Sequence, residues 1–209
     1  SSSSAPIKTS RWATQGVFSP SSALRSSGYS GDGHGKLILT GEHAVVYGFP
    51  AIAVGITTKT VVQLRPSPGP SVVDTHGADK QLSQVINTLC PIGFRISVQS
   101  SLPIGRGMGS SAALSVALVR ALASAHGHSP SADTVFEQAM RAERIFHRAP
   151  SGLDATVSSR GGVLYFMKGE PPIIDPLPTP RWSLIVLDSG QVGSTAEMYA
   201  REVFERYAA

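Results

Sequence analysis

The sequence predicts an α+β fold in which helices pack on a mixed sheet. Three observations carry this prediction. Short runs rich in β-branched residues, separated by Gly, Pro or Thr, are typical of strands. Longer segments carry apolar residues at helical spacing. A glycine-rich segment at residues 105–109 joins a strand pattern to a helix pattern.

The elements alternate along the chain, with a proline-containing turn expected at residues 65–70. Gly127 can end one helix and Ser131 can cap the next. The expected strands are residues 36–39, 51–56, 60–64, 94–98, 161–167 and 182–187. The expected helices are residues 82–89, 110–127, 131–147 and 195–207.

The chain divides into three regions. Residues 1–34 are rich in Ser and contain no acid before Asp32, so we expect a disordered leader, with a transit peptide as the alternative. Residues 35–187 should form the main domain. With 209 residues in all, only the start of a second domain has room, and we assign residues 188–209 to it.

Composition argues against several classes of protein. The formal net charge is +4, but Lys and Arg are scattered without a basic run, so we expect no nucleic-acid partner. No apolar run is long enough to cross a bilayer, so we expect no membrane partner. The single cysteine, Cys90, cannot form an internal disulfide and is expected to pack as a small side chain. A cytoplasmic protein is the default interpretation.

The segment from Leu102 to Ala113 should bind phosphate. Its three alternate glycines let backbone N–H groups approach an anion, and the helix that follows adds unsatisfied donors and a favourable dipole. It lacks the Lys-Ser/Thr ending of a P-loop and the glycine spacing of a dinucleotide fingerprint. The alternative is a glycine-rich connector with Ser110 as a helix cap.

Glu143 interrupts an apolar helix face. The stripe of Ala132, Val135, Phe136, Ala139 and Met140 continues to this carboxylate. A buried carboxylate needs a compensating cation. Mg²⁺ is one candidate, and an ion pair with Arg144, His147 or Arg148 is the other.

Three segments, taken together and in order, resemble the signatures of the galactokinase, homoserine kinase, mevalonate kinase and phosphomevalonate kinase (GHMP) superfamily. Residues 103–113 are similar to its second signature. Residues 36–48, with Glu42-His43-Ala44-Val45-Val46, resemble the first signature in the form that mevalonate kinases use. Residues 143–154, containing Pro150-Ser151-Gly152-Leu153-Asp154, resemble the stretch that carries a metal ligand and the catalytic base.

The resemblance implies ATP and Mg²⁺ as cofactors and gives each matching residue a role. Asp154 is the expected proton acceptor, with Lys36 beside it and the phosphates, and Ser111 and Glu143 are the expected metal ligands. Without the other motifs, Asp154 would be interpreted as a capping Asp, which is common after Gly in loops. The expected phosphate-binding residues are Gly105, Arg106, Gly107, Met108, Gly109, Ser110 and Ser111.

The resemblance also implies the acceptor, mevalonate, which becomes 5-phosphomevalonate in isoprenoid biosynthesis. Glu42, His43 and Thr195 are the expected substrate contacts, although Gln191 and Gly193 near Thr195 depart from the family pattern. A kinase of phosphomevalonate or homoserine is the runner-up, and a nucleotide-binding fragment without turnover is a further alternative. The resemblance includes a carboxyl-terminal domain that this sequence apparently lacks, so we expect little activity from the chain alone. The sequence leaves open whether the protein forms a homodimer.

Overall fold

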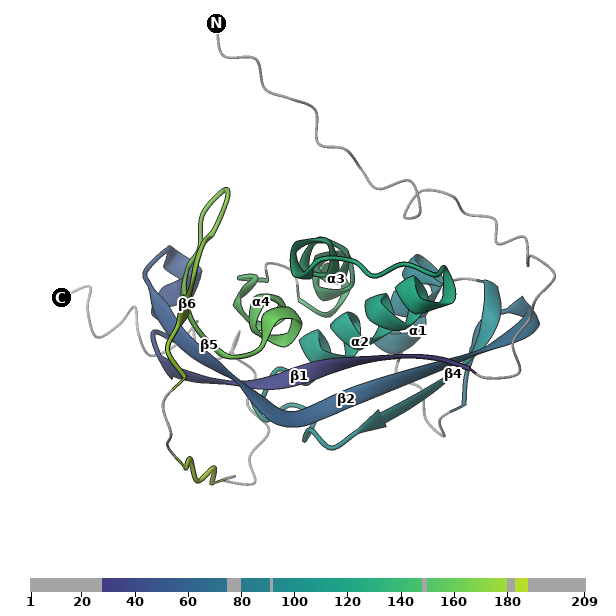
Figure 1. Cartoon of the computed structure of the whole chain (residues 1–209), viewed down its shortest axis with the longest axis horizontal. Coiled ribbons are helices and arrows are strands. Elements are labelled where there is room, and N and C mark those ends of the chain that lie inside the picture. Colours follow the sequence, from purple (N-terminus) through teal and green to yellow (C-terminus); the bar gives the residue numbers. More distant parts are fainter. Residues whose placement is uncertain (1–27, 75–79, 91, 148–149, 180–182, 188–209) are drawn as a thin grey trace, which may run out of the picture.

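The computed structural model describes residues 28–74, 80–90, 92–147, 150–179 and 183–187. Helices cover one face of a six-stranded sheet, as Figure 1 shows and as the α+β prediction requires. The strands are β1 (Tyr29–Thr40), β2 (Ala51–Pro70), β3 (Val72–Val73), β4 (Ile92–Ser100), β5 (Val163–Met167) and β6 (Ile173–Leu177). The helices are the 3-10 helix η2 (Ala44–Tyr47) and α1 (Lys80–Leu89), α2 (Ser110–Ala125), α3 (Ala132–Phe146) and α4 (Leu153–Arg160).

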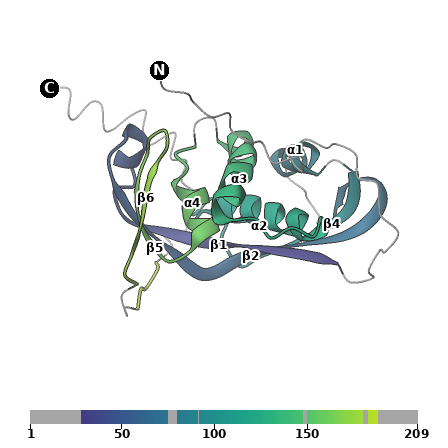
Figure 2. The same ribbon diagram turned by 45° about the horizontal axis from the view of Figure 1, so that its top comes forward.

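The 20-residue strand β2 organises the sheet. Along one edge it pairs antiparallel with β1, from Ile52 opposite Thr40 to Leu64 opposite Tyr29. Along the other edge it pairs antiparallel first with β5 and then with β4. The short strand β3 pairs parallel with β4, so the sheet is mixed as predicted. In Figure 2, β5 and β6 stand as an antiparallel hairpin at one end of the sheet.

Three apolar clusters hold the helices on the sheet. The first joins α1 and α2 to β2 and β4 through residues such as Phe94, Ile96 and Leu118. The second joins η2, α4 and β5 through Val45, Leu153 and Phe166. The third lies between α2, α3 and α4. Cys90 is buried in the first cluster, in agreement with its predicted packing role.

Strand β1 begins at Tyr29, six residues before the expected start of ordered structure. Its glycines explain why this polar stretch is nevertheless a strand. A methyl group added at Gly33 would overlap the carbonyl of Ala113, and one added at Gly31 would overlap that of Ala117. Helix α2 therefore packs against β1 backbone to backbone, and only glycine leaves the space.

The two strands expected at residues 51–56 and 60–64, and the turn expected at 65–70, are one strand, so the predicted turn is wrong. Pro66 lies opposite Phe94 of β4. On the other edge, the pairing with β1 stops at Leu64, which lies opposite Tyr29. No described residue pairs with that edge of β2 beyond Leu64. Beyond Leu64, β2 is therefore an edge strand on that side, and edge strands tolerate proline.

Two further expectations need correction. Residues 183–187 form no strand, and their apolar side chains are largely exposed, Leu187 by 90%. Helix α4 and strands β3 and β6 were not predicted. Residues 1–27, Trp182 and residues 188–209 lie outside the described residues, so the expected leader, helix 195–207 and second half stay predictions. Within the described residues, no helix is long and apolar enough to cross a membrane.

Candidate active site

The glycine-rich loop between β4 and α2 is tied to the first strand. Gly105, Gly107 and Gly109 all have positive φ angles, between 70° and 71°, which favour glycine. The backbone N–H of Lys36 donates a hydrogen bond to the carbonyl of Met108 over 3.0 Å. A methyl group at Gly109 would lie 2.8 Å from Cγ of Lys36. The loop and the Lys36 side chain therefore share one tightly packed space.

The loop runs directly into the start of α2. Gly109 is the N-cap residue and Ser110 is the first residue of the helix, so the alternative with Ser110 as the cap is wrong. The first intrahelical bond is made by the N–H of Ala113, which donates to Gly109. The preceding N–H groups, including those of Ser110 and Ser111, have no intrahelical acceptor. This end of the helix is thus suited to an anion such as phosphate.

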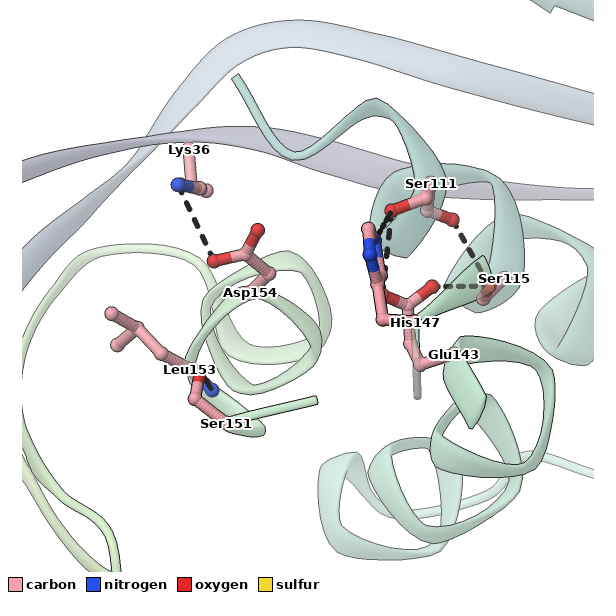
Figure 3. Close-up of polar contacts among 8 residues, drawn as sticks. All are labelled: Lys36, Ser111, Ser115, Glu143, His147, Ser151, Leu153 and Asp154. Carbon is pink, nitrogen blue, oxygen red and sulfur yellow. Dashed lines mark hydrogen bonds and ion pairs between the residues drawn. The ribbon is translucent and has the colours of Figure 1, made fainter. Parts of the chain in front are cut away.

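Lys36 and Asp154 form an ion pair beside this loop. Figure 3 shows the Lys36 ammonium directed at the Asp154 carboxylate, with Nζ and Oδ1 3.3 Å apart. The Lys36 side chain is 5% exposed and that of Asp154 36% exposed. Lys36 lies within β1, next to a break in its register with β2, and not at the strand start.

Asp154 lies in the first turn of α4, not in a loop. Gly152 precedes that helix with a φ of 86°, and Ser151 Oγ accepts a hydrogen bond from the Leu153 N–H. A carboxylate is stabilised at a helix amino terminus by the helix dipole. Asp154 therefore has two sources of positive potential, the helix end and Lys36.

Glu143 of α3 is buried opposite the start of α2, as its position in the apolar stripe predicted. Ser115 donates a hydrogen bond to Oε1 over 2.8 Å and Ser111 donates one to Oε2 over 3.3 Å (Figure 3). Burial raises the pKa of Glu143 to about 7 and the charge of Asp154 adds to the rise, although both serine hydrogen bonds oppose it. The carboxylate is thus held mainly by neutral hydroxyl groups.

The proposed alternative of an ion pair for Glu143 has limited support. Nε2 of His147 lies 4.0 Å from Oε2 and is also within 3.2 Å of Ser111 Oγ. His147 is exposed, and it contributes a charge only when protonated. Arg148 lies outside the described residues, and Arg144 is exposed.

The donor set at Glu143 fits Mg²⁺. The described residues contain no cluster of three or more His, Cys, Asp or Glu side chains suited to a metal. Mg²⁺ in nucleotide sites needs no such cluster, because one or two protein oxygens and the phosphates suffice. Ser111 Oγ and the buried Glu143 carboxylate are oxygen donors next to the predicted phosphate loop. They would hold the ion there.

The predicted substrate contacts are less well supported than the residues around the phosphate loop. Glu42 and His43 lie on the exposed turn between β1 and η2, with His43 at the N-cap position of η2. Thr195 lies outside the described residues. Ser115 was missed by the sequence analysis, although its spacing of four from Ser111 puts both hydroxyls on one helix face.

Comparison with known proteins shows what the chain is similar to. Residues 78–162 match the family description "GHMP kinases N terminal domain". The mevalonate kinase of Thermococcus sibiricus is 32% identical over 198 residues, which cover 79% of this chain and 59% of that protein. The mevalonate kinase of Pyrococcus horikoshii is 31% identical over 82% of this chain and 60% of its own length.

Solved structures give the same relationship. L. major mevalonate kinase in complex with R-mevalonate is similar with a TM-score of 0.63 at 29% identity, over 75% of this chain and 55% of that one. Mevalonate kinase from methicillin-resistant Staphylococcus aureus has a TM-score of 0.57 at 32% identity, over 73% and 56%. This chain spans 59% and 60% of the two curated relatives. The described residues have the fold of a GHMP kinase amino-terminal domain, and residues 78–162 carry the sequence pattern of that domain.

Proposed function

We propose that the protein transfers the terminal phosphoryl group of ATP to the 5-hydroxyl of mevalonate and so acts in cytoplasmic isoprenoid biosynthesis. The observation that carries the proposal is the Lys36–Asp154 pair beside the glycine-rich loop, with Nζ and Oδ1 3.3 Å apart. A base, a cation and a phosphate-binding helix end are the groups that phosphoryl transfer to an alcohol requires. The choice of mevalonate rests on the relatives named above.

In this proposal Asp154 accepts the hydroxyl proton as the alcohol oxygen attacks the terminal phosphorus and ADP leaves. Lys36 keeps Asp154 oriented and presents positive charge to the phosphates. The loop from Gly105 to Gly109, with Arg106 and Met108, and the N–H groups of Ser110 and Ser111 hold the phosphate oxygens. Mg²⁺, held by Ser111 and Glu143, supplies charge neutralisation of the phosphates when bound. Glu42, His43 and Thr195 are the proposed contacts to mevalonate.

An acceptor assay tests the proposal. The chain is incubated with ATP, Mg²⁺ and either mevalonate, phosphomevalonate or homoserine, and phosphorylated products are followed by ³¹P NMR. The same assay is run on the chain extended by the carboxyl-terminal part of the T. sibiricus mevalonate kinase. We expect phosphorylation of mevalonate alone, with the higher rate in the extended protein. Faster phosphorylation of either other acceptor, or no transfer by either protein, would contradict the assignment.

A further inference from the structure

Three of the elements that carry the proposed site meet a second time, away from the reacting groups. Strand β1 carries Lys36, helix α2 follows the phosphate loop and carries Ser111, and helix α4 carries Asp154. The second meeting point is Arg120, in the second half of α2. No role was assigned to Arg120 from the sequence.

The Arg120 guanidinium donates to two backbone carbonyls on two different elements. Nη1 donates to the carbonyl of Asp32 in β1 over 2.7 Å, and Nη2 donates to the carbonyl of Ser159 in α4 over 2.7 Å. Nη1 also lies 3.6 Å from Oδ1 of Asp32. A planar guanidinium with its donors in a fixed fork can hold two acceptors in one geometry, which an ammonium cannot do.

The bond to Ser159 caps the carboxyl end of helix α4. Ser159 is the second-last residue of α4 and is 3% exposed, and its carbonyl has no intrahelical donor because the helix stops at Arg160. A buried carbonyl without a donor is costly, and a cation at a helix carboxyl terminus is favourable. Arg120 meets both needs.

The same bond fixes where α4 lies along β1. Asp154 precedes Ser159 by five residues in the same helix, about 7.5 Å along its axis. Asp32 precedes Lys36 by four residues in β1. Anchoring Ser159 to Asp32 therefore constrains the distance between Asp154 and Lys36, which lie on the same two elements.

We propose that Arg120 is a positioning residue, which holds α4 against β1 so that Asp154 stays paired with Lys36. The effect on turnover rests on the proposed function, whereas the effect on α4 does not. A displacement of about 1 Å at reacting groups can lower a rate by about a hundredfold.

Two nearby ion pairs provide matched controls. Lys59 of β2 pairs with Oδ2 of Asp32 over 2.7 Å and so joins β2 to β1. Arg160 pairs with Asp133 of α3 and so ties the same end of α4 to a helix that carries neither Lys36 nor Asp154. Lys59→Gln and Arg160→Gln each remove one charge and one ion pair, as Arg120→Gln does.

The first measurement is hydrogen–deuterium exchange of the free chain. In Arg120→Gln we expect amides of α4 to exchange about tenfold faster while those of the α2 and β1 interior keep the parent rate. Lys59→Gln should leave the difference between α4 and β1 unchanged, and Arg160→Gln, which removes a partly exposed ion pair, should speed exchange in α4 much less than Arg120→Gln. A uniform rise over β1, α2 and α4 would show a general stabilising role and overturn the proposal, as would unchanged exchange in α4.

The second measurement separates turnover from binding. Arg120→Gln should lower kcat for mevalonate by about tenfold to a hundredfold with the ATP Kd within twofold of the parent, whereas Lys59→Gln and Arg160→Gln should keep the parent kcat. Arg120→Lys retains the charge and should still show the loss of kcat, and it serves if Arg120→Gln fails to fold. Parent kcat in a folded Arg120→Lys would overturn the proposal. If neither the unsubstituted chain nor its extended form phosphorylates any acceptor, the proposed function fails. The exchange measurement alone then decides the role of Arg120.

Discussion

Asp154 and Glu143 are two carboxylates of the same candidate site, and the protein balances their charges differently. Asp154 is 36% exposed and has the Lys36 ammonium 3.3 Å away. Glu143 is buried, and the hydroxyls of Ser111 and Ser115 donate hydrogen bonds to it. Asp154 therefore has a permanent counter-charge from the chain itself, whereas Glu143 is surrounded by neutral hydroxyls and by His147, which is charged only when protonated. We therefore expect removal of the Asp154 charge to lower turnover, and removal of the Glu143 charge to raise stability.

The largest effect should come from Asp154→Asn. The amide keeps the size of the side chain but cannot accept the hydroxyl proton, so kcat should fall by about 10²- to 10⁴-fold. The ATP Kd, measured by calorimetry, should stay within twofold. Asp175→Asn, an exposed change in β6, is the control and should leave kcat alone. A near-parent kcat in Asp154→Asn would remove Asp154 from the role of base.

Glu143→Gln should stabilise the folded chain at high pH. Burial raises the pKa of Glu143 from 4.5 to about 7, so between these values the folded chain binds more protons than the unfolded chain. The free energy of unfolding should therefore fall as pH rises through this window, by on the order of 3 kcal/mol.

The measurement is urea unfolding between pH 4 and pH 8, without ATP or Mg²⁺. Glu143→Gln should lose this slope and be more stable than the parent at pH 8. Glu137→Gln, an exposed change on the same helix, should keep the parent slope. An identical slope in Glu143→Gln would mean that Glu143 ionises freely in the folded chain.

Binding of Mg²⁺ with ATP sharpens the comparison from the ligand side. Ser111→Ala and Glu143→Gln each remove an oxygen donor from one proposed ion, so each should raise the Mg²⁺ concentration for half-saturation by about tenfold. The double variant should show less than the product of the two effects, because both groups share a partner. Mg²⁺ titration at fixed ATP, with Glu137→Gln as the control, measures this. Unchanged half-saturation in both single variants would exclude this pair as ligands.

The smallest effect concerns the loop that connects the two sides. Gly107 and Gly109 have φ angles of 70° and 71°, so alanine is strained by about 1 kcal/mol at either. At Gly107 nothing lies within 4 Å of the added methyl, whereas at Gly109 it meets Cγ of Lys36 at 2.8 Å.

Gly109→Ala should therefore destabilise the chain by about 1 kcal/mol more than Gly107→Ala, and it alone should displace Lys36. Thermal unfolding of the two variants gives the comparison, with the shift of Lys36 followed by NMR of its Nζ group. Equal stabilities would show that the Lys36 stem moves aside without cost.

The sequence predicted Glu143 better than it predicted the surroundings of Asp154, for a physical reason. Helix α3 is amphipathic, so its apolar stripe revealed both the helix and the buried carboxylate. Helix α4 is buried on most sides and includes small polar residues, Thr156, Ser158 and Ser159, so no stripe distinguishes it from a loop. Its helical state depends on contacts with α2, α3 and β1 that a periodic pattern does not contain.

The same limit applies to β1 and to the ion pair. The pairing of Lys36 with Asp154 was expected only from family resemblance, because 118 positions separate the two residues and no local rule joins them. The first half of β1 is polar and glycine-rich, which is typical of disordered segments. It is a strand because β2 pairs with it and α2 packs on it.

The backbone contact between β1 and α2 has a consequence for how this protein tolerates sequence change. A survey of every substitution should find Gly31 and Gly33 intolerant, because an added methyl group at either would overlap the backbone of α2. Neither glycine offers a functional group to a substrate, so their intolerance would record interatomic space alone. At Lys36, three residues further on, intolerance would record charge. A ranking of positions by sensitivity would therefore mix the two causes, and replacing Lys36 by Met, which preserves bulk without charge, would tell them apart.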